Sequence, residues 1–89
     1  MTTAEPKITI YTTPYCPYCH AAKALLKRKG AQFEEVDVQD PGRRQQMMLR
    51  TNGRRTVPQI FIGETHVGGS DDIHELDRRG QLDSMLQHR

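Results

Sequence analysis

The sequence predicts an α/β domain in which a four-stranded mixed sheet is flanked by helices. Two observations lead to this fold class. Short segments rich in β-branched residues alternate with longer segments whose apolar residues recur at helical spacing. Their order is β-α-β-α-β-β-α, for which a sheet with helices on both faces is the compact solution.

The first strand and the first helix are expected over Ile8–Thr12 and residues 17–29. The strand alternates and is rich in β-branched residues. Pro17 fits the first helical position, where its missing N–H is not needed. Basic residues fill the last turn and Gly30 follows it, as is typical of a helix C-terminus.

The second strand is expected over Phe33–Val38, and a second helix follows it. Asp40 is placed as the N-cap and Pro41 as the first helical residue. This helix should run to about Thr51, where Asn52-Gly53 ends it. The first two strands are joined through a helix, so they should be parallel with a right-handed crossover.

The last two strands are expected over Gln59–Ile62 and Thr65–Val67, as an antiparallel hairpin. Gly63-Glu64 between them suits a two-residue turn. A helix should follow over about Asp71–Arg79. Helical spacing continues toward the C-terminus in three apolar residues, Leu82, Met85 and Leu86.

Length and composition indicate one domain over residues 1–89, with residues 1–6 as an N-terminal tail. The segment Met1–Lys7 has no apolar run and no cleavage pattern, so no signal peptide is expected. No segment approaches the roughly 20 apolar residues of a membrane span. We therefore expect a monomeric cytoplasmic protein with no membrane partner.

Basic residues slightly outnumber acidic ones, 13 to 11, and the net charge is +2. Five arginines lie close together in the sequence: Arg43, Arg44, Arg50, Arg54 and Arg55. The pI of about 8.7 falls short of values typical of nucleic-acid-binding domains, and no aromatic residue lies among these arginines. We interpret them as a solvated or small-anion-binding face and expect no nucleic-acid partner.

The only two cysteines lie in Cys16-Pro17-Tyr18-Cys19. A disulfide between them closes a very short loop and constrains the unfolded chain little, so it is a poor structural staple. Cys16 falls at the expected helix start, where free N–H groups and the helix dipole stabilise a thiolate. Cys19 lies one turn deeper on the same face. We predict Cys16 as the exposed nucleophile and Cys19 as the resolving thiol.

Two other chemistries are compatible with the pair. A zinc site would need two further ligands, from carboxylates or from the histidines His20, His66, His74 and His88. Cys16–His20 also spells C-x-x-C-H, a haem-attachment pattern. Covalent haem normally accompanies export and a helical fold, so we do not expect haem. Because the pair supplies only two of the ligands that zinc needs, we do not expect a metal either.

Three motifs together resemble the dithiol glutaredoxins of the C-P-Y-C type, within the thioredoxin-fold superfamily. They are Cys16–Cys19, Arg55-Thr56-Val57-Pro58 and Gly68-Gly69-Ser70-Asp71-Asp72, and the resemblance covers about residues 7–87. It implies a thioredoxin-like fold. The absence of tryptophan and the presence of Tyr18 between the cysteines distinguish the chain from thioredoxins.

The resemblance implies glutathione as co-substrate and a set of residues that bind it. These are Tyr18, Thr56, Val57, Pro58, Gly69, Ser70 and Asp71. It also implies a cis bond between Val57 and Pro58. N–H groups at Ser70 and Asp71 would hold the γ-glutamyl carboxylate, because helix starts bind anions. Simple N-capping by Ser70 or Asp71 is the alternative.

One position departs from the family pattern. Thr13 stands where many glutaredoxins have a lysine near the glycyl carboxylate of glutathione. Gln45 or a nearby arginine is a candidate to hold that carboxylate instead.

The function implied is glutathione-dependent reduction of protein disulfides and of glutathione mixed disulfides. The partners are glutathione and disulfide-containing or glutathionylated proteins. A thioredoxin-like reductase fed by a reductase protein is the nearest alternative. An iron–sulfur cluster carrier is a further one, although Pro17 counts against it.

Overall fold

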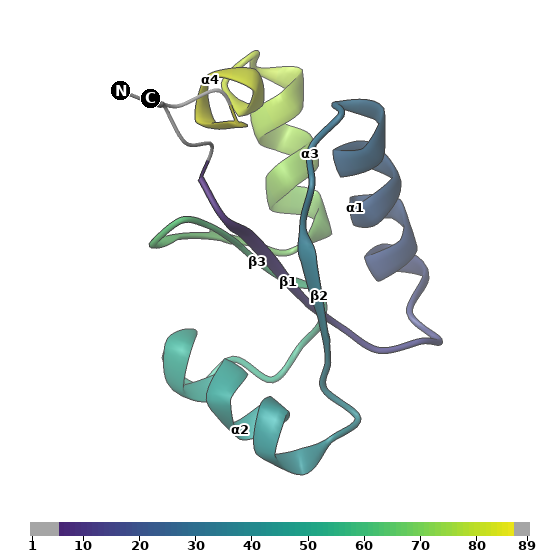
Figure 1. Ribbon diagram of the computed structural model, residues 1–89, viewed down its shortest axis with the longest axis vertical. Coiled ribbons are helices and arrows are strands. Elements are labelled where there is room, and N and C mark those ends of the chain that lie inside the picture. The colour runs from purple at the N-terminus through teal and green to yellow at the C-terminus, as the bar shows by residue number, and fades with distance from the viewer. Residues whose placement is uncertain (1–5, 87–89) are drawn as a thin grey trace.

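Four strands form one mixed sheet in the computed structural model, which describes residues 6–86 (Figure 1). They are β1 (Ile8–Thr12), β2 (Glu34–Asp37), β3 (Gln59–Ile62) and β4 (Thr65–Gly68), in the spatial order β2-β1-β3-β4. β1 is parallel to β2 and antiparallel to β3, and β3 is antiparallel to β4. The predicted parallel pairing of the first two strands and the predicted antiparallel hairpin are both confirmed.

Helices cover both faces of the sheet (Figure 1). α1 (Pro17–Arg28), α3 (Ser70–Arg78) and α4 (Leu82–Leu86) lie on one side, and α2 (Pro41–Arg50) lies on the other. All five residues of β1 are buried. This central strand is therefore packed on both faces, as expected for a strand covered by helices on both sides.

The core has one cluster on each side of the sheet. The larger cluster joins Ile10 and Ile60 to α1, α3 and α4 through Leu25, Ile73 and Leu82. The smaller one lies under α2 and comprises Tyr11, Val38, Met47 and Phe61. Burying a side chain of this size contributes about 1.5–3 kcal/mol, so the two clusters fix both layers against the sheet.

Local sequence signals account for the helix ends. The Asp40 carboxylate accepts the Arg43 backbone N–H at 2.9 Å, which caps α2 as predicted. Gly30 follows α1 with a φ of +72°, a conformation that glycine adopts without steric cost. Helices and strands begin and end within one residue of the sequence-based expectation. Residues 1–5 of the expected tail lie outside the described residues.

Three segments meet at one end of the sheet because of this topology. β1 leaves the sheet there, and β3 enters it there because Tyr11 pairs with Gln59. β4 also leaves at this end, since Gly68 pairs with Ile60. The segments that follow β1, precede β3 and follow β4 carry the three sequence motifs.

Candidate functional site

The cysteine pair lies at the junction of β1 and α1. Cys16 has extended backbone angles and is the N-cap of α1, with Pro17 as the first helical residue. The Cys19 backbone N–H donates to the Cys16 Sγ at 3.1 Å. The sulfur therefore occupies the place of a capping acceptor, at the positive end of the helix dipole. This geometry favours negative charge on the Cys16 sulfur.

The two thiols differ in accessibility. Both are free, Cys16 is 8% exposed and Cys19 is 0% exposed. We expected Cys16 to be exposed, and this was wrong. The Val57 carbonyl covers it, and the Cys16 thiol donates to that oxygen at 3.7 Å. Cys16 remains the more accessible sulfur of the two.

Burial also separates the two thiols chemically. It raises the pKa of the Cys19 thiol to about 12, assisted by the hydrogen bond to Cys16. A backbone hydrogen bond from Thr13 and the charge of Lys23 act in the opposite direction but are smaller. At physiological pH Cys19 is therefore a neutral thiol. Because only a thiolate attacks a disulfide, Cys19 does not react until it loses its proton.

A half-buried ion pair lies next to this buried thiol. Lys23 Nζ donates to Glu35 Oε2 at 2.8 Å, and Thr12 Oγ1 donates to the same oxygen at 2.7 Å. These two hydrogen bonds, that of Lys23 first, lower the pKa of the Glu35 carboxyl. Glu35 of β2, which also accepts from Thr12 of β1, thereby holds the Lys23 ammonium group close to Cys19.

A groove of about 370 Å³ runs beside the cysteine pair. Ten residues line it: Tyr18, Arg54, Thr56, Val57, Pro58, Gln59, Gly69, Ser70, Asp71 and Asp72. All seven residues expected to contact glutathione are among them. Sequence reasoning missed the role of three, Arg54, Gln59 and Asp72.

The wall before β3 contains a cis bond between Val57 and Pro58, as the resemblance implied. A hydrogen-bond network that starts from Gln59 of β3 supports this wall. The buried Gln59 Nε2 donates to Thr56 O at 3.0 Å and to Thr56 Oγ1 at 3.1 Å. The Gln59 Oε1 lies 2.7 Å from His66 Nε2, so the His66 ring donates there. Thr56 is thus held in place at the wall of the groove, with its hydroxyl oxygen accepting from Gln59.

The position of His66 is itself fixed by stacking. Its ring lies 4.8 Å from the Phe61 ring, with an interplanar angle of 21°. Burial lowers the pKa of His66, and the charges of Arg54 and Arg50 lower it further against the opposing effect of Asp72. His66 is therefore neutral at physiological pH. The predicted hairpin places Phe61 opposite His66, but no sequence signal pointed to the hydrogen bond between His66 and Gln59.

The opposite wall is the start of α3, and its capping differs from the prediction. Gly69 is the N-cap, and the Asp72 carboxylate accepts its backbone N–H at 2.8 Å. Ser70 is the first helical residue, and its hydroxyl lies 3.3 Å from His74 Nδ1. Capping by Ser70 or Asp71 was therefore wrong. In a capping box the side chain three residues after the N-cap accepts the N-cap backbone N–H, so the spacing could have pointed to Asp72.

Gly68 makes this cap possible. Its φ is +117°, and a Cβ there would overlap the Asp72 carboxylate. Only glycine combines that backbone angle with that contact. The N–H groups of Ser70 and Asp71 stay free of intrahelical partners, as in any first helical turn. Both residues line the groove, so these N–H groups are available to donate hydrogen bonds to an anion there.

The residues considered for the glycyl carboxylate lie at different places relative to the groove. Arg54 lines the groove, whereas Thr13 and Gln45 are not among its lining residues. The described residues offer no geometric support for a zinc site. Residues 6–86 contain no group of three or more His, Cys, Asp or Glu side chains suited to a metal. His88 lies outside them.

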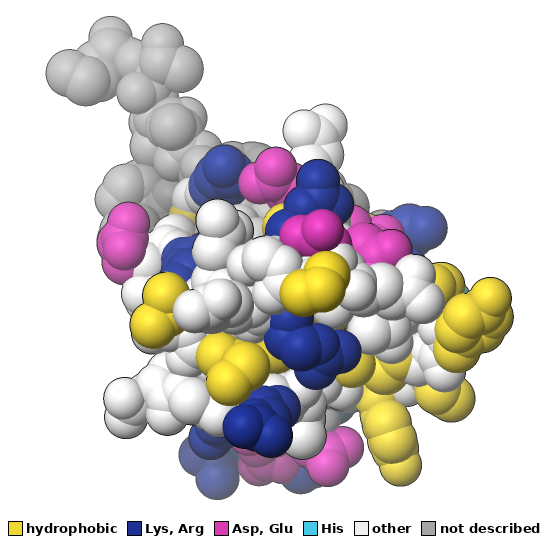
Figure 2. Space-filling view, turned by 90° about the horizontal axis from the view of Figure 1, so that it is seen from below, with side chains coloured by type: hydrophobic (Ala, Val, Ile, Leu, Met, Phe, Trp, Pro, Cys, Tyr) yellow, Lys and Arg dark blue, Asp and Glu magenta, His cyan; other side chains and the backbone are white. Residues whose placement is uncertain are grey.

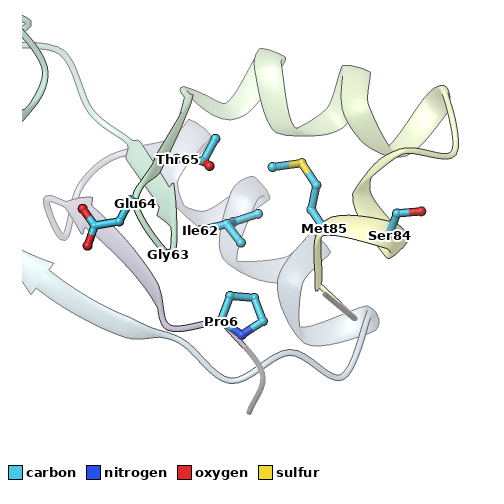
Figure 3. A pocket seen from close by; sticks show the side chains of 7 residues that line it. All are labelled: Pro6, Ile62, Gly63, Glu64, Thr65, Ser84 and Met85. Atoms are coloured by element: carbon cyan, nitrogen blue, oxygen red, sulfur yellow. The ribbon is translucent and has the colours of Figure 1, made fainter. Parts of the chain in front are cut away.

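A second groove, of about 500 Å³, lies at the far end of the sheet (Figure 3). The β3–β4 turn with Ile62 and Glu64 forms one side, and Met85 and Ser84 of α4 form the other. It contains neither cysteine nor histidine. Its larger volume therefore does not make it the better candidate for thiol chemistry.

The fold and the paired thiols define a thiol–disulfide oxidoreductase of the thioredoxin-like class. The glutaredoxin family profile matches residues 8–67. The chain is 52% identical over 81 residues to a glutaredoxin of Pseudomonas aeruginosa, an alignment that covers 91% of this chain and 96% of that protein. This chain belongs to the glutaredoxin family.

Solved structures agree. A glutaredoxin from Brucella melitensis superposes with a TM-score of 0.83 and 52% identity, covering 96% of this chain and 92% of that one. A buckwheat glutaredoxin–glutathione complex superposes with a TM-score of 0.80 and 34% identity, covering 92% and 76%. Within residues 6–86, no helix is both long and apolar enough to span a membrane.

Proposed function

We propose that this protein reduces glutathione mixed disulfides and protein disulfides at the expense of glutathione, through Cys16 and Cys19. The observation that carries the proposal is the position of the Cys16 sulfur. It accepts an N–H at the start of α1 and lies against Val57, a wall of the groove. A similar glutaredoxin from buckwheat has been solved with glutathione.

For a glutathionylated substrate, one thiol suffices. The Cys16 thiolate attacks the glutathione sulfur, a Cys16–glutathione disulfide forms, and the substrate leaves as a thiolate that takes up a proton. A glutathione thiolate then attacks the glutathione sulfur of this mixed disulfide. Oxidised glutathione leaves and the Cys16 thiolate returns. One added glutathione is thus consumed, and the glutathionyl group taken from the substrate forms the other half of the oxidised glutathione.

For a protein disulfide, both cysteines take part. Cys16 attacks and forms a mixed disulfide with the protein, releasing one substrate thiol. Cys19 loses its proton and attacks the Cys16 sulfur, which releases the second substrate thiol and leaves a Cys16–Cys19 disulfide. One glutathione thiolate opens this disulfide by attack on Cys16, and a second returns the pair to the dithiol.

The groove residues divide the glutathione molecule between them. Ser70 and Asp71 N–H groups would hold the γ-glutamyl carboxylate, and the Asp71 carboxylate would accept from the ammonium group. The backbone of Val57, beside Thr56 and Pro58, would pair with the extended peptide. Tyr18 and Gly69 would flank it. Arg54 lies in the groove and so suits the glycyl carboxylate.

The test is a coupled assay with glutathione, glutathione reductase and a small glutathione mixed disulfide. Cys16→Ser should be inactive with every substrate. Cys19→Ser should keep the mixed-disulfide activity and lose reduction of a protein disulfide. An active Cys16→Ser with a dead Cys19→Ser would reverse the two roles.

A wild-type protein that turns over only with a reductase protein and NADPH would favour the thioredoxin-like alternative. The cytoplasmic location and the monomeric state expected from the sequence are part of the proposal.

A further inference from the structure

The arginine-rich segment that the glutathione reaction does not use lies beside the groove. Between Pro41 and Pro58 the chain has five arginines and neither aspartate nor glutamate. Ion pairs form in other parts of the described chain. The ion pairs found among residues 6–86 are Lys7–Glu34, Lys23–Glu35, Lys29–Asp77, Lys29–Asp83, Glu75–Arg78 and Glu75–Arg79. None of them involves the five arginines.

Two of the five arginines have structural roles. Arg44 donates from Nε to Val38 O at 3.2 Å and from Nη1 to Arg55 O at 2.9 Å. Arg50 donates to the Tyr11 hydroxyl at 2.9 Å, and its guanidinium lies 3.9 Å from the centre of the Phe61 ring. These contacts fix α2 and the loop after it.

The Arg44 contact also ties the segment with Arg55 to α2. Arg44 of α2 holds the Arg55 backbone, and Arg43 precedes Arg44 in that helix. Arg43 and Arg55 are both exposed. Arg54, their neighbour, already belongs to the groove. Arg43 and Arg55 therefore extend the positive charge of the groove outward; we call this pair the arginine surface.

The arginine surface lies within reach of a polypeptide whose disulfide is at Cys16. Val57 contacts the Cys16 sulfur, and Arg55 precedes Val57 by two residues. Their Cα atoms are thus at most about 7 Å apart. A substrate backbone extended along Val57 advances about 3.3 Å per residue. A carboxylate about two to four residues from the reactive cysteine would lie opposite Arg55.

The surroundings favour a protein over a nucleic acid. Figure 2 views the molecule from the α2 side and shows Lys and Arg side chains next to hydrophobic ones on this face. Leu49 on α2 is 77% exposed and Tyr18 at the groove is 65% exposed. Tyrosine and arginine are enriched in protein interfaces. No aromatic residue lies between Arg43 and Arg55 on which a base could stack.

We propose that Arg43 and Arg55 dock an acidic segment of the protein substrate. The segment carries Asp or Glu a few residues from the disulfide that Cys16 attacks. Guanidinium groups bind carboxylates in a forked geometry, and complementary charge raises the association rate. A docking role rests on the proposed function, since the docked segment must deliver its disulfide to Cys16.

The test compares three peptides of equal length, each with one glutathionylated cysteine and with Glu, Gln or Lys three residues from it. At low salt the wild type should prefer the Glu peptide over the Gln peptide, and the Lys peptide should be poorest. Added salt should remove the preference, because exposed charges are screened. In the Arg43→Gln/Arg55→Gln variant, kcat/KM for the Glu peptide should fall about 2- to 30-fold, as expected for two exposed ion pairs.

A matched control removes two positive charges elsewhere. Lys27 and Arg28 are exposed at the far end of α1, and Lys27→Gln/Arg28→Gln should keep the preference. Both double variants should reduce a small glutathione mixed disulfide as the wild type does. A wild type that fails with this small substrate refutes the proposed function instead.

Two results would overturn docking at the arginine surface. One is an equal loss in both double variants, which would mean that only net charge matters. The other is a wild type that shows no preference for the Glu peptide at low salt. Tight, Arg43- and Arg55-dependent binding of a single-stranded oligonucleotide would then make the surface a nucleic-acid site.

Discussion

Two adjacent aspartates at the start of α3 should have different roles, and replacing each by alanine tests this. Asp72 Oδ2 accepts the Gly69 N–H at 2.8 Å, so it holds the helix start together. Asp71 is exposed and lines the groove. We expect Asp72→Ala to lower the stability of the fold. We expect Asp71→Ala to weaken the use of glutathione and to leave the fold nearly as stable as before.

The stability difference follows from the cap. Either variant loses a negative charge from the first turn of the helix, which contributes about 0.3–1 kcal/mol. Only Asp72→Ala also loses a capping interaction, which contributes about 0.5–2 kcal/mol. In a domain of this size, about 1 kcal/mol shifts the Tm by roughly 4–8 °C. Asp72→Ala should therefore melt several degrees below Asp71→Ala in a thermal denaturation followed by circular dichroism.

The binding difference follows from the proposed role of Asp71. A hydrogen bond to a charged group contributes about 1.5–3 kcal/mol, and 1.4 kcal/mol corresponds to a factor of ten. Asp71→Ala should thus weaken the dependence of the rate on glutathione by roughly 10- to 150-fold. Solvent access to the groove favours the lower end. Asp71→Asn, which keeps the shape and loses the charge, is the matched control and should behave like Asp71→Ala.

The reasoning is refuted if the two effects are exchanged. An Asp71→Ala variant that melts as low as Asp72→Ala, with unchanged glutathione dependence, would make Asp71 a structural residue. An Asp72→Ala variant with the wild-type Tm would show that the Asp72 cap does not stabilise the start of α3.

Three other expectations concern titration and positioning. In Cys16→Ser, alkylation of Cys19 should stay slow until the pH passes well above the ordinary thiol value of 9.0, because burial remains the main cause of its raised pKa; rapid alkylation near neutral pH would contradict this. His66→Phe keeps a ring stacked on its neighbour but removes the donor beneath the groove. We expect KM for a glutathione mixed disulfide to rise about 2- to 10-fold with little change in kcat, and a change in kcat alone would count against a positioning role. Since the pKa of Glu35 is lowered from 4.5, this carboxylate stabilises the fold above that pH, and the contribution is lost as the pH falls through the lower folded value. Lys23→Gln should make stability less dependent on pH in that acid range, as measured by urea melts.

Much of the fold could be predicted because its signals are local. Asp40 before a first-turn proline caps α2 as expected, and Gly30 ends α1. The alternation in Ile8–Thr12 and the spacing of the turn residues placed every strand. The cis bond before Pro58 was expected from the family resemblance alone, since nothing in the neighbouring residues requires it.

What could not be predicted depends on contacts between distant segments. The Val57 carbonyl that covers Cys16 lies 41 residues away in sequence, and no local pattern reports such a contact. Gln59 was expected only as a strand residue, yet its pairing with His66 supports a wall of the groove. The cap of α3 was missed for another reason. Several polar residues competed for one role, and the backbone angle of Gly68 decided in favour of Asp72.

The geometry of one helical turn accounts for the division between the two cysteines. Three residues along α1, Cys19 turns toward the core, while Cys16 stays at the rim with an N–H donated to its sulfur. An external thiol or disulfide approaching through the groove therefore meets Cys16 first. Cys19, neutral and buried, is suited to react only with a disulfide already formed at Cys16, next to the charge of Lys23 that favours its deprotonation. In the mechanism that we propose, Cys16 alone would exchange with glutathione, and Cys19 would act only on substrates that stay bound.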